Sequence, residues 1–339
     1  MTDWRQRRMC VQCVLVESLP DITIDENGLC SVCTRVACAP KPAGGEEFLE
    51  SDLTKMLAKH RGKQPYDCLV MCSGGKDSTS SLFYMKRRYK MNPLAFTFDQ
   101  GFETQEALDN VHKAVEVLGV DFLFYRSNAM KEMFARALRS GSNVVLCHLC
   151  SIWYMQLTFD VAARYDIPII VAGWTKGQST KQGVMSKCGC NAASPEFQSM
   201  SKATKEFLAT LKGDPRYNDF PQSMEEVLER AKKRHKAVVV SPHWFLGGHA
   251  DDYVETIQRE LGWQYPKLSY PAKSTNCSLN FVSVYQSLQK WGFTHYHVEM
   301  SKMIRANLMT RDEALQMLDF EPDRALLDSI TGKLGVTLP

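Results

Sequence analysis

The sequence predicts an α/β protein with a doubly wound parallel sheet, a small N-terminal ribbon and a helical C-terminal tail. The sheet is indicated by apolar, strand-like runs that alternate with helix-like runs between residues 65 and 172. A glycine turn at residues 73–78 joins the first of these strands to a helix. The ribbon is indicated by two pairs of closely spaced cysteines within residues 1–38.

Four strands are predicted from short apolar runs bounded by turn residues, and these runs are 65–72, 93–98, 121–125 and 168–172. Helices are predicted from apolar spacings of three and four residues, and they cover 48–60, the segment after the glycine turn up to Tyr89, 103–118, 130–138 and 152–165. In the tail, Thr310 and Glu313 have the spacing of a capping box, so a helix is expected to begin there.

Composition divides the chain into four parts: a zinc ribbon at 1–38, a linker and helix at 39–64, the main domain at 65–300 and a helical tail at 301–339. Within the main domain, residues 173–220 are rich in Gly, Ser, Thr, Lys and Asn and interrupt the alternation of strands and helices. The only extended helix pattern there is 199–211. We predict that this segment is an insertion or a lid over the functional site.

The 339 residues are 44% hydrophobic and 23% charged, with a net charge of +3, an ordinary globular balance. No apolar run approaches the roughly 20 residues that a membrane-spanning helix needs. The N-terminus also lacks the apolar segment of a signal peptide. We therefore expect a cytoplasmic protein without a membrane partner. Its twelve cysteines are expected to be metal ligands or redox groups and not disulfides.

The hexapeptide Ser73-Gly74-Gly75-Lys76-Asp77-Ser78 lies between the first strand and its helix. Two glycines let the backbone approach a ligand closely, and the free amides of a helix N-terminus attract anions. Lys76 adds a point charge suited to phosphate. The Walker A spacing is absent, and the hexapeptide instead resembles the PP-loop of ATP pyrophosphatases, a superfamily with a HUP-like fold. The resemblance implies cleavage of Mg²⁺-bound ATP to AMP and pyrophosphate. It also implies that all six residues bind the nucleotide and that Lys76 and Asp77 take part in catalysis.

Further nucleotide contacts are expected at the carboxyl ends of the neighbouring strands, because ligands bind there in doubly wound sheets. The resemblance implies that backbone groups around Phe98 and Asp99 read the adenine or the ribose. The alternative is a plain turn in which Asp99 acts as a cap. Gly173 ends the fourth strand and should face the site, and Lys176 could contact phosphate or lie in solvent.

Cys10, Cys13, Cys30 and Cys33 form two CxxC pairs that are sixteen residues apart. This spacing is typical of a structural zinc site with four thiolates and no open coordination position. A segment this short buries little apolar surface, so the metal would supply most of its folding free energy. Cys38 is expected to be a free thiol.

Cys147 and Cys150 form a third CxxC pair, which lies between a strand-like stretch at 143–146 and a predicted helix. Cys277 is a late single cysteine. A CxxC after the PP-loop with one late cysteine resembles the iron–sulfur tRNA thiolation enzymes. That resemblance implies a [4Fe–4S] cluster with one open iron that binds sulfide for transfer to an adenylated carbon. The alternatives are core thiols or a second zinc site. Cys188 and Cys190, in the predicted lid, could be a catalytic persulfide or resolving pair, or exposed loop residues.

A competing resemblance rests on the segment from Cys10 to Cys33, with its Pro20-Asp-Ile-Thr-Ile-Asp-Glu-Asn-Gly28 centre, and on the tail at 309–315. Both segments resemble the N-acetyl sugar amidotransferases of surface-polysaccharide synthesis. Those enzymes use ammonia from a partner glutaminase. The middle of the chain departs from this family, because the Cys147 and Cys188 pairs are not associated with its ammonia-using members.

The sequence thus predicts an adenylating enzyme, with sulfur transfer as the first choice for the second half-reaction and amide formation as the second. A non-catalytic nucleotide-binding module is a distant third. The sequence does not identify the acceptor, which could be a small molecule, a sugar or a tRNA. A sulfur donor or a glutaminase could be the protein partner, and the chain could form a homodimer. Two basic clusters, 86–88 and 232–236, would contact tRNA phosphates, although most such runs are solvated helix faces.

Overall fold

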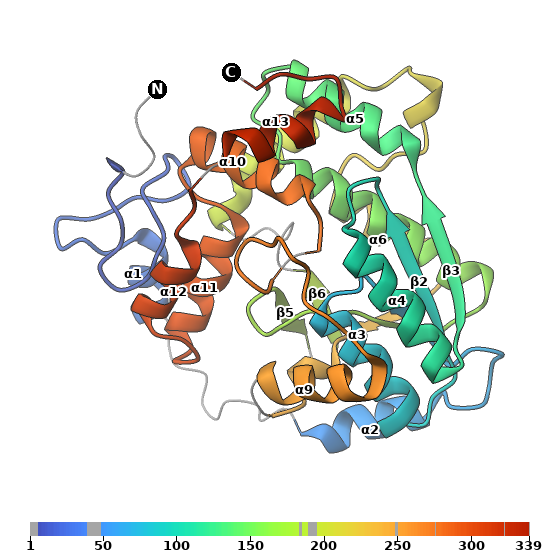
Figure 1. Ribbon diagram of the computed structural model, residues 1–339. Coiled ribbons are helices and arrows are strands. Elements are labelled where there is room, and N and C mark those ends of the chain that lie inside the picture. The colour runs from blue at the N-terminus through green and yellow to red at the C-terminus, as the bar shows by residue number, and fades with distance from the viewer. Residues whose placement is uncertain are drawn as a thin grey trace.

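The computed structural model describes residues 6–38, 49–182, 185–188, 195–247, 250–274, 276–321 and 323–338. Its centre is a five-stranded parallel sheet with the strand order β3-β2-β1-β4-β7 (Figure 1). The strands are β1 (Cys68–Met71), β2 (Pro93–Asp99), β3 (Asp121–Arg126), β4 (Ile169–Val171) and β7 (Val238–Val240). β1 lies between β2 and β4, so the chain winds outward in both directions from it. The predicted doubly wound α/β class is confirmed.

Alternate residues of the central strands point to opposite faces of the sheet, and each face is covered by its own helices. Cys68 and Val70 pack against α2 (Glu50–Ala58), α3 (Lys76–Phe83), α4 (Gln105–Leu118) and α9 (Ala250–Leu261). Leu69 and Met71 belong to the core of the other face, with α5 (Asn128–Arg139), α6 (Leu146–Arg164), α7 (Gln198–Ala209), α8 (Met224–Arg234), α10 (Leu279–Trp291) and α13 (Arg324–Gly332).

Two local predictions differ from the structure. The run 143–146 was expected to be strand-like, but it leads directly into α6, whose first residue is Leu146. Val144, Leu146 and Leu149 are buried in the core at the start of this helix, and this apolar run has no period that separates strand from helix. Cys147 and Cys150 therefore lie on the first turns of α6. The short strand β7 was not predicted, because three consecutive valines after a basic helix give no alternation to read.

The segment 173–220 contains a two-stranded antiparallel hairpin, β5 (Ser179–Gln182) and β6 (Met185–Cys188), followed by α7. The predicted helix at 199–211 thus corresponds to α7. Phe207, Leu208 and Leu211 lie in the core beside α6. The helical half of the segment is therefore packed into the domain and is not a hinged lid. For the rest of the segment, the lid stays a prediction.

The N-terminal segment folds through isolated β-bridges, such as Met9 with Val16, into α1 (Ser31–Cys38). Figure 1 shows it beside α11 (His295–Arg305) and α12 (Arg311–Leu318) of the C-terminal region. The expected capping box at the start of α12 is present, with Thr310 and Glu313 bonded reciprocally. Across the described stretches of the chain, no helix combines the length and apolar character needed to cross a bilayer.

Candidate nucleotide and metal sites

The PP-loop residues lie at the carboxyl end of β1, where the order of the sheet reverses. α3 begins at Lys76, so its first amides face the glycine turn. The hydroxyl of Ser78 accepts a hydrogen bond from the amide of Ser73 at 3.2 Å and donates one to the carbonyl of Gly75 at 3.2 Å. These bonds close the turn around a helix N-terminus that is suited to an anion.

Gly74 has a φ of +76°, and a Cβ there would lie 2.0 Å from the carbonyl oxygen of Ala107 on α4. The carbonyl of Gly74 accepts hydrogen bonds from the indole of Trp263 at 2.8 Å and from the amide of Asn110 at 3.2 Å. Asn110 also exchanges two hydrogen bonds with the backbone of Gln264. α4 and the segment after α9 thus fix the turn.

Lys76 and Asp77 form an ion pair of 2.7 Å, and their side chains are 19% and 14% exposed. The other carboxylate oxygen of Asp77 accepts the hydroxyl of Tyr253 at 2.5 Å. His243 lies 2.9 Å from the carbonyl of Asp77, and burial lowers the pKa of this imidazole. A carboxylate oriented in this way beside a phosphate site is a suitable ligand for Mg²⁺.

The carboxyl ends of β2 and β4 lie on either side of the end of β1. The carbonyl of Phe96 accepts a hydrogen bond from the amide of Cys72. The backbone groups of Phe98, two residues later on β2, point to the same side, toward β1. Phe98 lies beyond the last residue of β1. Asp99 acts within a plain turn after β2. Its carboxylate accepts a hydrogen bond from the amide of Gly101 at 2.6 Å and forms an ion pair with Arg126 at 3.4 Å. The side chain of Asp99 is therefore engaged within the turn, and a contact of the Phe98 backbone with adenine or ribose stays a prediction.

Gly173 touches the first turn of α3, since a Cβ at this residue would lie 2.5 Å from the backbone nitrogen of Ser78. Any larger residue would push the end of β4 away from the PP-loop. Lys176 is exposed three residues further along. A contact of Lys176 with phosphate stays a prediction.

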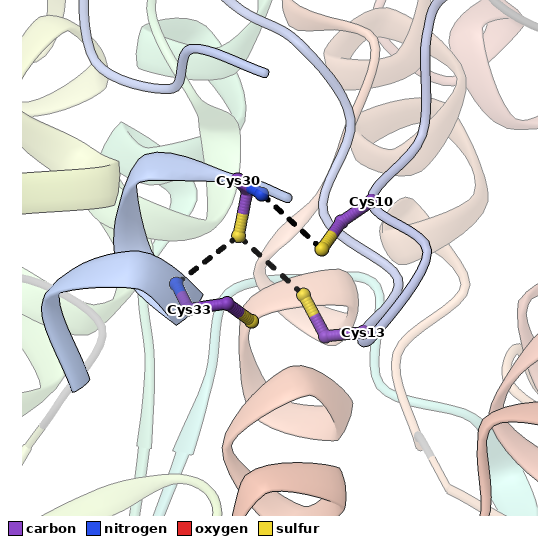
Figure 2. A group of neighbouring side chains, drawn as sticks. All are labelled: Cys10, Cys13, Cys30 and Cys33. Atoms are coloured by element: carbon purple, nitrogen blue, oxygen red, sulfur yellow. Dashed lines mark hydrogen bonds between the residues drawn. The ribbon is translucent and has the colours of Figure 1, made fainter. Parts of the chain in front are cut away.

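The four N-terminal cysteines come together in one buried group (Figure 2). Their sulfur atoms all lie within 4.8 Å of one another, and those of Cys13 and Cys30 are 3.7 Å apart. Tetrahedral coordination with Zn–S bonds of about 2.3 Å needs sulfur atoms about 3.8 Å apart. The donor set therefore fits one tetrahedral ion; zinc as that ion stays a prediction.

Backbone amides and two arginines surround this group. The amides of Cys30 and Cys33 point at the sulfur atoms of Cys10 and Cys30 at 3.3 and 3.4 Å. Arg311 of α12 donates to the carbonyls of Cys13 and Cys10 at 3.1 and 3.2 Å, and the guanidinium of Arg305 lies 3.9 Å from the sulfur of Cys33. Donors of this kind orient the ligands and offset the negative charge of four thiolates.

The second cysteine set also converges. Cys147, Cys150 and Cys277 line one cavity of about 220 Å³, which we call the thiol cavity, together with the carboxyl of Glu103. Gln100 donates to the sulfur of Cys277 at 3.0 Å and to Glu103 at 2.9 Å. Burial, reinforced by the charge of Asp99, raises the pKa of Glu103 to about 8. Three thiols around one space suit a metal–sulfur group, for which thiolates are the usual ligands.

The thiol cavity adjoins the PP-loop through one residue. Asn276 directly precedes Cys277, and its side-chain amide lies 3.5 Å from the hydroxyl of Ser73. A Cβ on Gly75 would lie 2.4 Å from the same amide nitrogen. Asn276 thus connects the Cys277 side of the thiol cavity to the PP-loop.

The side chains of the remaining pair, Cys188 and Cys190, are not described by the structure. Cys188 is the last residue of β6, where its backbone pairs with Ser179, and its side chain is outside what the structure describes. Cys190 lies outside the described residues. A catalytic role for this pair stays a prediction.

Several site residues had no signal in the sequence. Asn110, Trp263, Tyr253 and His243 reach the PP-loop from helices and turns far along the chain. Each is a single polar or aromatic residue without a motif. Glu103 could have been found, because it follows the strand end at Asp99 that was already assigned to the site.

We expect Gly173→Ala to reduce ATP affinity at least about tenfold, because the added methyl displaces the first turn of α3 and misaligns its amides. Titration with a fluorescent ATP analogue measures this effect. Gly247→Ala is the matched control, since a Cβ there meets nothing within 4 Å. Equal affinity of the Gly173 variant and the wild type would remove this contact from the nucleotide site.

We expect one zinc per chain, to be lost from Cys10→Ala/Cys13→Ala and kept by the triple variant Cys147→Ala/Cys150→Ala/Cys277→Ala. The reason is that only the first variant removes ligands from the four-cysteine group. Elemental analysis of purified protein decides the matter, and wild-type protein free of zinc would end the prediction.

Comparison with known proteins gives one family match. The model of the family described as "Queuosine biosynthesis protein QueC" matches residues 67–164, under a third of the chain, which run from β1 through the PP-loop to α6. An uncharacterized protein of Methanocaldococcus jannaschii is 21% identical over 263 residues, which cover 78% of this chain and 75% of that protein.

Two solved structures are similar at low scores. The NMN synthetase of Francisella tularensis is 11% identical, with a TM-score of 0.40, and the match covers 85% of this chain and 95% of that one. The NH3-dependent NAD synthetase of Campylobacter jejuni is 12% identical, with a TM-score of 0.32, and covers 54% and 90%. The family match covers the glycine turn with its flanking strand and helix, and it agrees with the resemblance of residues 73–78 to the PP-loop of ATP pyrophosphatases.

Proposed function

We propose that the protein cleaves ATP to AMP and pyrophosphate, adenylates a carbonyl or carboxylate oxygen of an acceptor, and replaces that oxygen with sulfur. The observation that carries the sulfur step is the thiol cavity, in which Cys147, Cys150 and Cys277 surround a space next to the PP-loop. The adenylation step is supported by the PP-loop and its family match.

In this proposal the PP-loop amides and Lys76 hold the phosphates and offset the charge that develops on pyrophosphate. Asp77, oriented by Tyr253, is the carboxylate that would hold Mg²⁺. The acceptor oxygen forms a bond to the α-phosphorus, and the bond from that phosphorus to pyrophosphate breaks. The acceptor carbon then bonds to sulfide and releases AMP, which leaves with the acceptor oxygen.

The three cavity thiols would be the protein ligands of a [4Fe–4S] cluster, and such a cluster would supply a site for sulfide. Gln100 and Glu103 would hold the Cys277 side of the cavity in place. The hydroxyl of Ser283 lies 3.2 Å from the sulfur of Cys147 and would donate to this thiolate on the α6 side once it binds a metal.

Amide formation is the second candidate, favoured by the resemblance of the N-terminal ribbon and the 309–315 tail to N-acetyl sugar amidotransferases. Ammonia would then take the place of sulfide in the same displacement. The basic clusters do not favour a tRNA acceptor, because Arg88 pairs with Glu50 at 2.5 Å and Arg234 pairs with Asp160.

We expect AMP and pyrophosphate as products in the presence of an acceptor extract of small molecules and tRNA. Lys76→Ala should lower turnover about 10²–10³-fold, by analogy with deletion of one oxyanion donor. Chromatography of radiolabelled ATP products measures both effects. Lys113→Ala, an exposed lysine of α4, is the control. Formation of ADP and phosphate would contradict the proposal, and unchanged turnover would remove Lys76 from the reaction.

We expect anaerobically reconstituted enzyme to incorporate ³⁵S-sulfide and not ¹⁵N-ammonium into the extract when ATP is present. Cys277→Ala should lose this incorporation, whereas Cys68→Ala, a cysteine buried under α3 and α4, should keep it. Incorporation of ammonium alone, with full activity of Cys277→Ala, would replace the sulfur proposal with the amidotransferase.

A further inference from the structure

A second cavity, of about 210 Å³, lies between the loop that follows β4 and helix α11. Its polar lining is Gln178 of the loop with His295, Glu299 and Lys302 of α11, and Trp174 and Gly177 complete the loop side. We call it the Glu299 cavity. Neither the PP-loop nor the three cavity cysteines are part of its lining.

Glu299 is fixed in position within this cavity. The hydroxyl of Thr175 donates to its carboxylate at 3.1 Å, and a Cβ on Gly177 would lie 2.6 Å from its Cγ, so the loop is packed directly on this side chain. Burial raises the pKa of Glu299 to about 7. The charge of Asp77 adds to this effect, whereas Lys76 and the hydrogen bonds from Thr175 and Gln178 oppose it.

The Glu299 cavity adjoins both the PP-loop and the thiol cavity. Trp174 directly follows Gly173, the residue in contact with the first turn of α3, and the carbonyl of Trp174 is held by Ser241 at 2.6 Å. His295 lines both this cavity and the thiol cavity. A molecule bound here would therefore have the phosphates on one side and the thiols on the other.

The lining favours one class of occupant. Another carboxylate placed beside a buried carboxyl group would raise the cost of ionising both. An N–H or O–H group is instead a good partner for Glu299, and an aromatic wall such as Trp174 suits a neutral ring. Among the described residues, Lys302 of α11 is the lysine in the lining of this cavity.

We propose that the Glu299 cavity binds the acceptor, that the acceptor is a neutral molecule with an N–H beside its carbonyl, and that Glu299 accepts the proton of that N–H. This inference rests on the proposed adenylation. As the carbonyl oxygen bonds to the α-phosphorus, the N–H bonding pair forms the C=N bond of the imidate, the proton moves to the carboxylate of Glu299, and pyrophosphate leaves. No oxidant or reductant is needed.

The binding test uses three probes in the presence of α,β-methylene-ATP: uridine and N-acetylglucosamine, which carry an N–H beside a carbonyl, and glucuronate, which carries a carboxylate. We expect saturation-transfer NMR at pH 8 to show both amide probes bound and glucuronate at least about tenfold weaker, because of charge repulsion. Glu299→Gln should remove this discrimination, since the glutamine amide can donate to a carboxylate. Glu255→Gln, an exposed carboxyl on α9, should keep it.

Three results would overturn the inference: no binding of either amide probe to the wild type, a preference of the wild type for glucuronate, or the same discrimination in Glu299→Gln. Gln178→Ala provides a second variant of the same wall and should weaken the amide probes while ATP affinity stays unchanged.

The turnover test measures AMP release with the acceptor extract between pH 6 and 8.5. Glu299 acts in its ionised form, so the wild-type rate should fall as the pH drops through about 7. Glu299→Gln should be about 10²–10⁴-fold slower and lose this dependence. If the wild type releases no AMP at any pH, the proposed function fails while the binding test still decides the cavity. If AMP is released and Glu299→Gln matches the wild type, the inference alone fails.

Discussion

The hydrogen bonds from Trp263 and Asn110 to the carbonyl of Gly74 are the constraint on which the nucleotide site depends. A left-handed glycine between a serine and a second glycine has little to hold it in place by itself. Two buried donors converging on one carbonyl fix that conformation, and Asn110 carries the restraint on to Gln264. The amides of α3 therefore face the turn before any phosphate arrives, which is the preorganisation that an anion site needs.

The same turn explains why the two cavities lie on either side of the PP-loop. β1 is central, so the strand ends on both of its sides reach the PP-loop. On the β2 side the chain leads through Asp99 and Gln100 to the thiol cavity, and on the β4 side through Gly173 and Trp174 to the Glu299 cavity. The central position of β1 therefore determines that the thiol cavity lies on one side of the PP-loop and the Glu299 cavity on the other.

Much of this arrangement could be predicted from the sequence, because the signals are local. The SGGKDS turn is directly flanked in the sequence by its strand and its helix, and the four N-terminal cysteines have a spacing typical of a metal site. β7 and the early start of α6 were missed, since Val238–Val240 and 143–146 are apolar runs without a period. Glu299 was missed for a different reason. A single glutamate on a C-terminal helix looks like a solvated residue until tertiary packing places Gly177 and Thr175 over it.

Helix α11 has two sides with different neighbours. Arg305 reaches toward Cys33, and Val298 belongs to the same core cluster as Cys10, Cys13, Cys30 and Cys33, whereas Glu299 faces the cavity. The nucleotide-binding turn is built entirely from residues after Asp67, but the wall of the Glu299 cavity is supported by a segment that a bound metal would fold. Under the proposed function, this division would imply an order of maturation: a newly made chain would bind nucleotide before metal binds the N-terminal segment, and would gain a firm second wall only afterwards. Metal supply would then set how many of the folded molecules in a cell are competent, without changing how tightly they hold ATP.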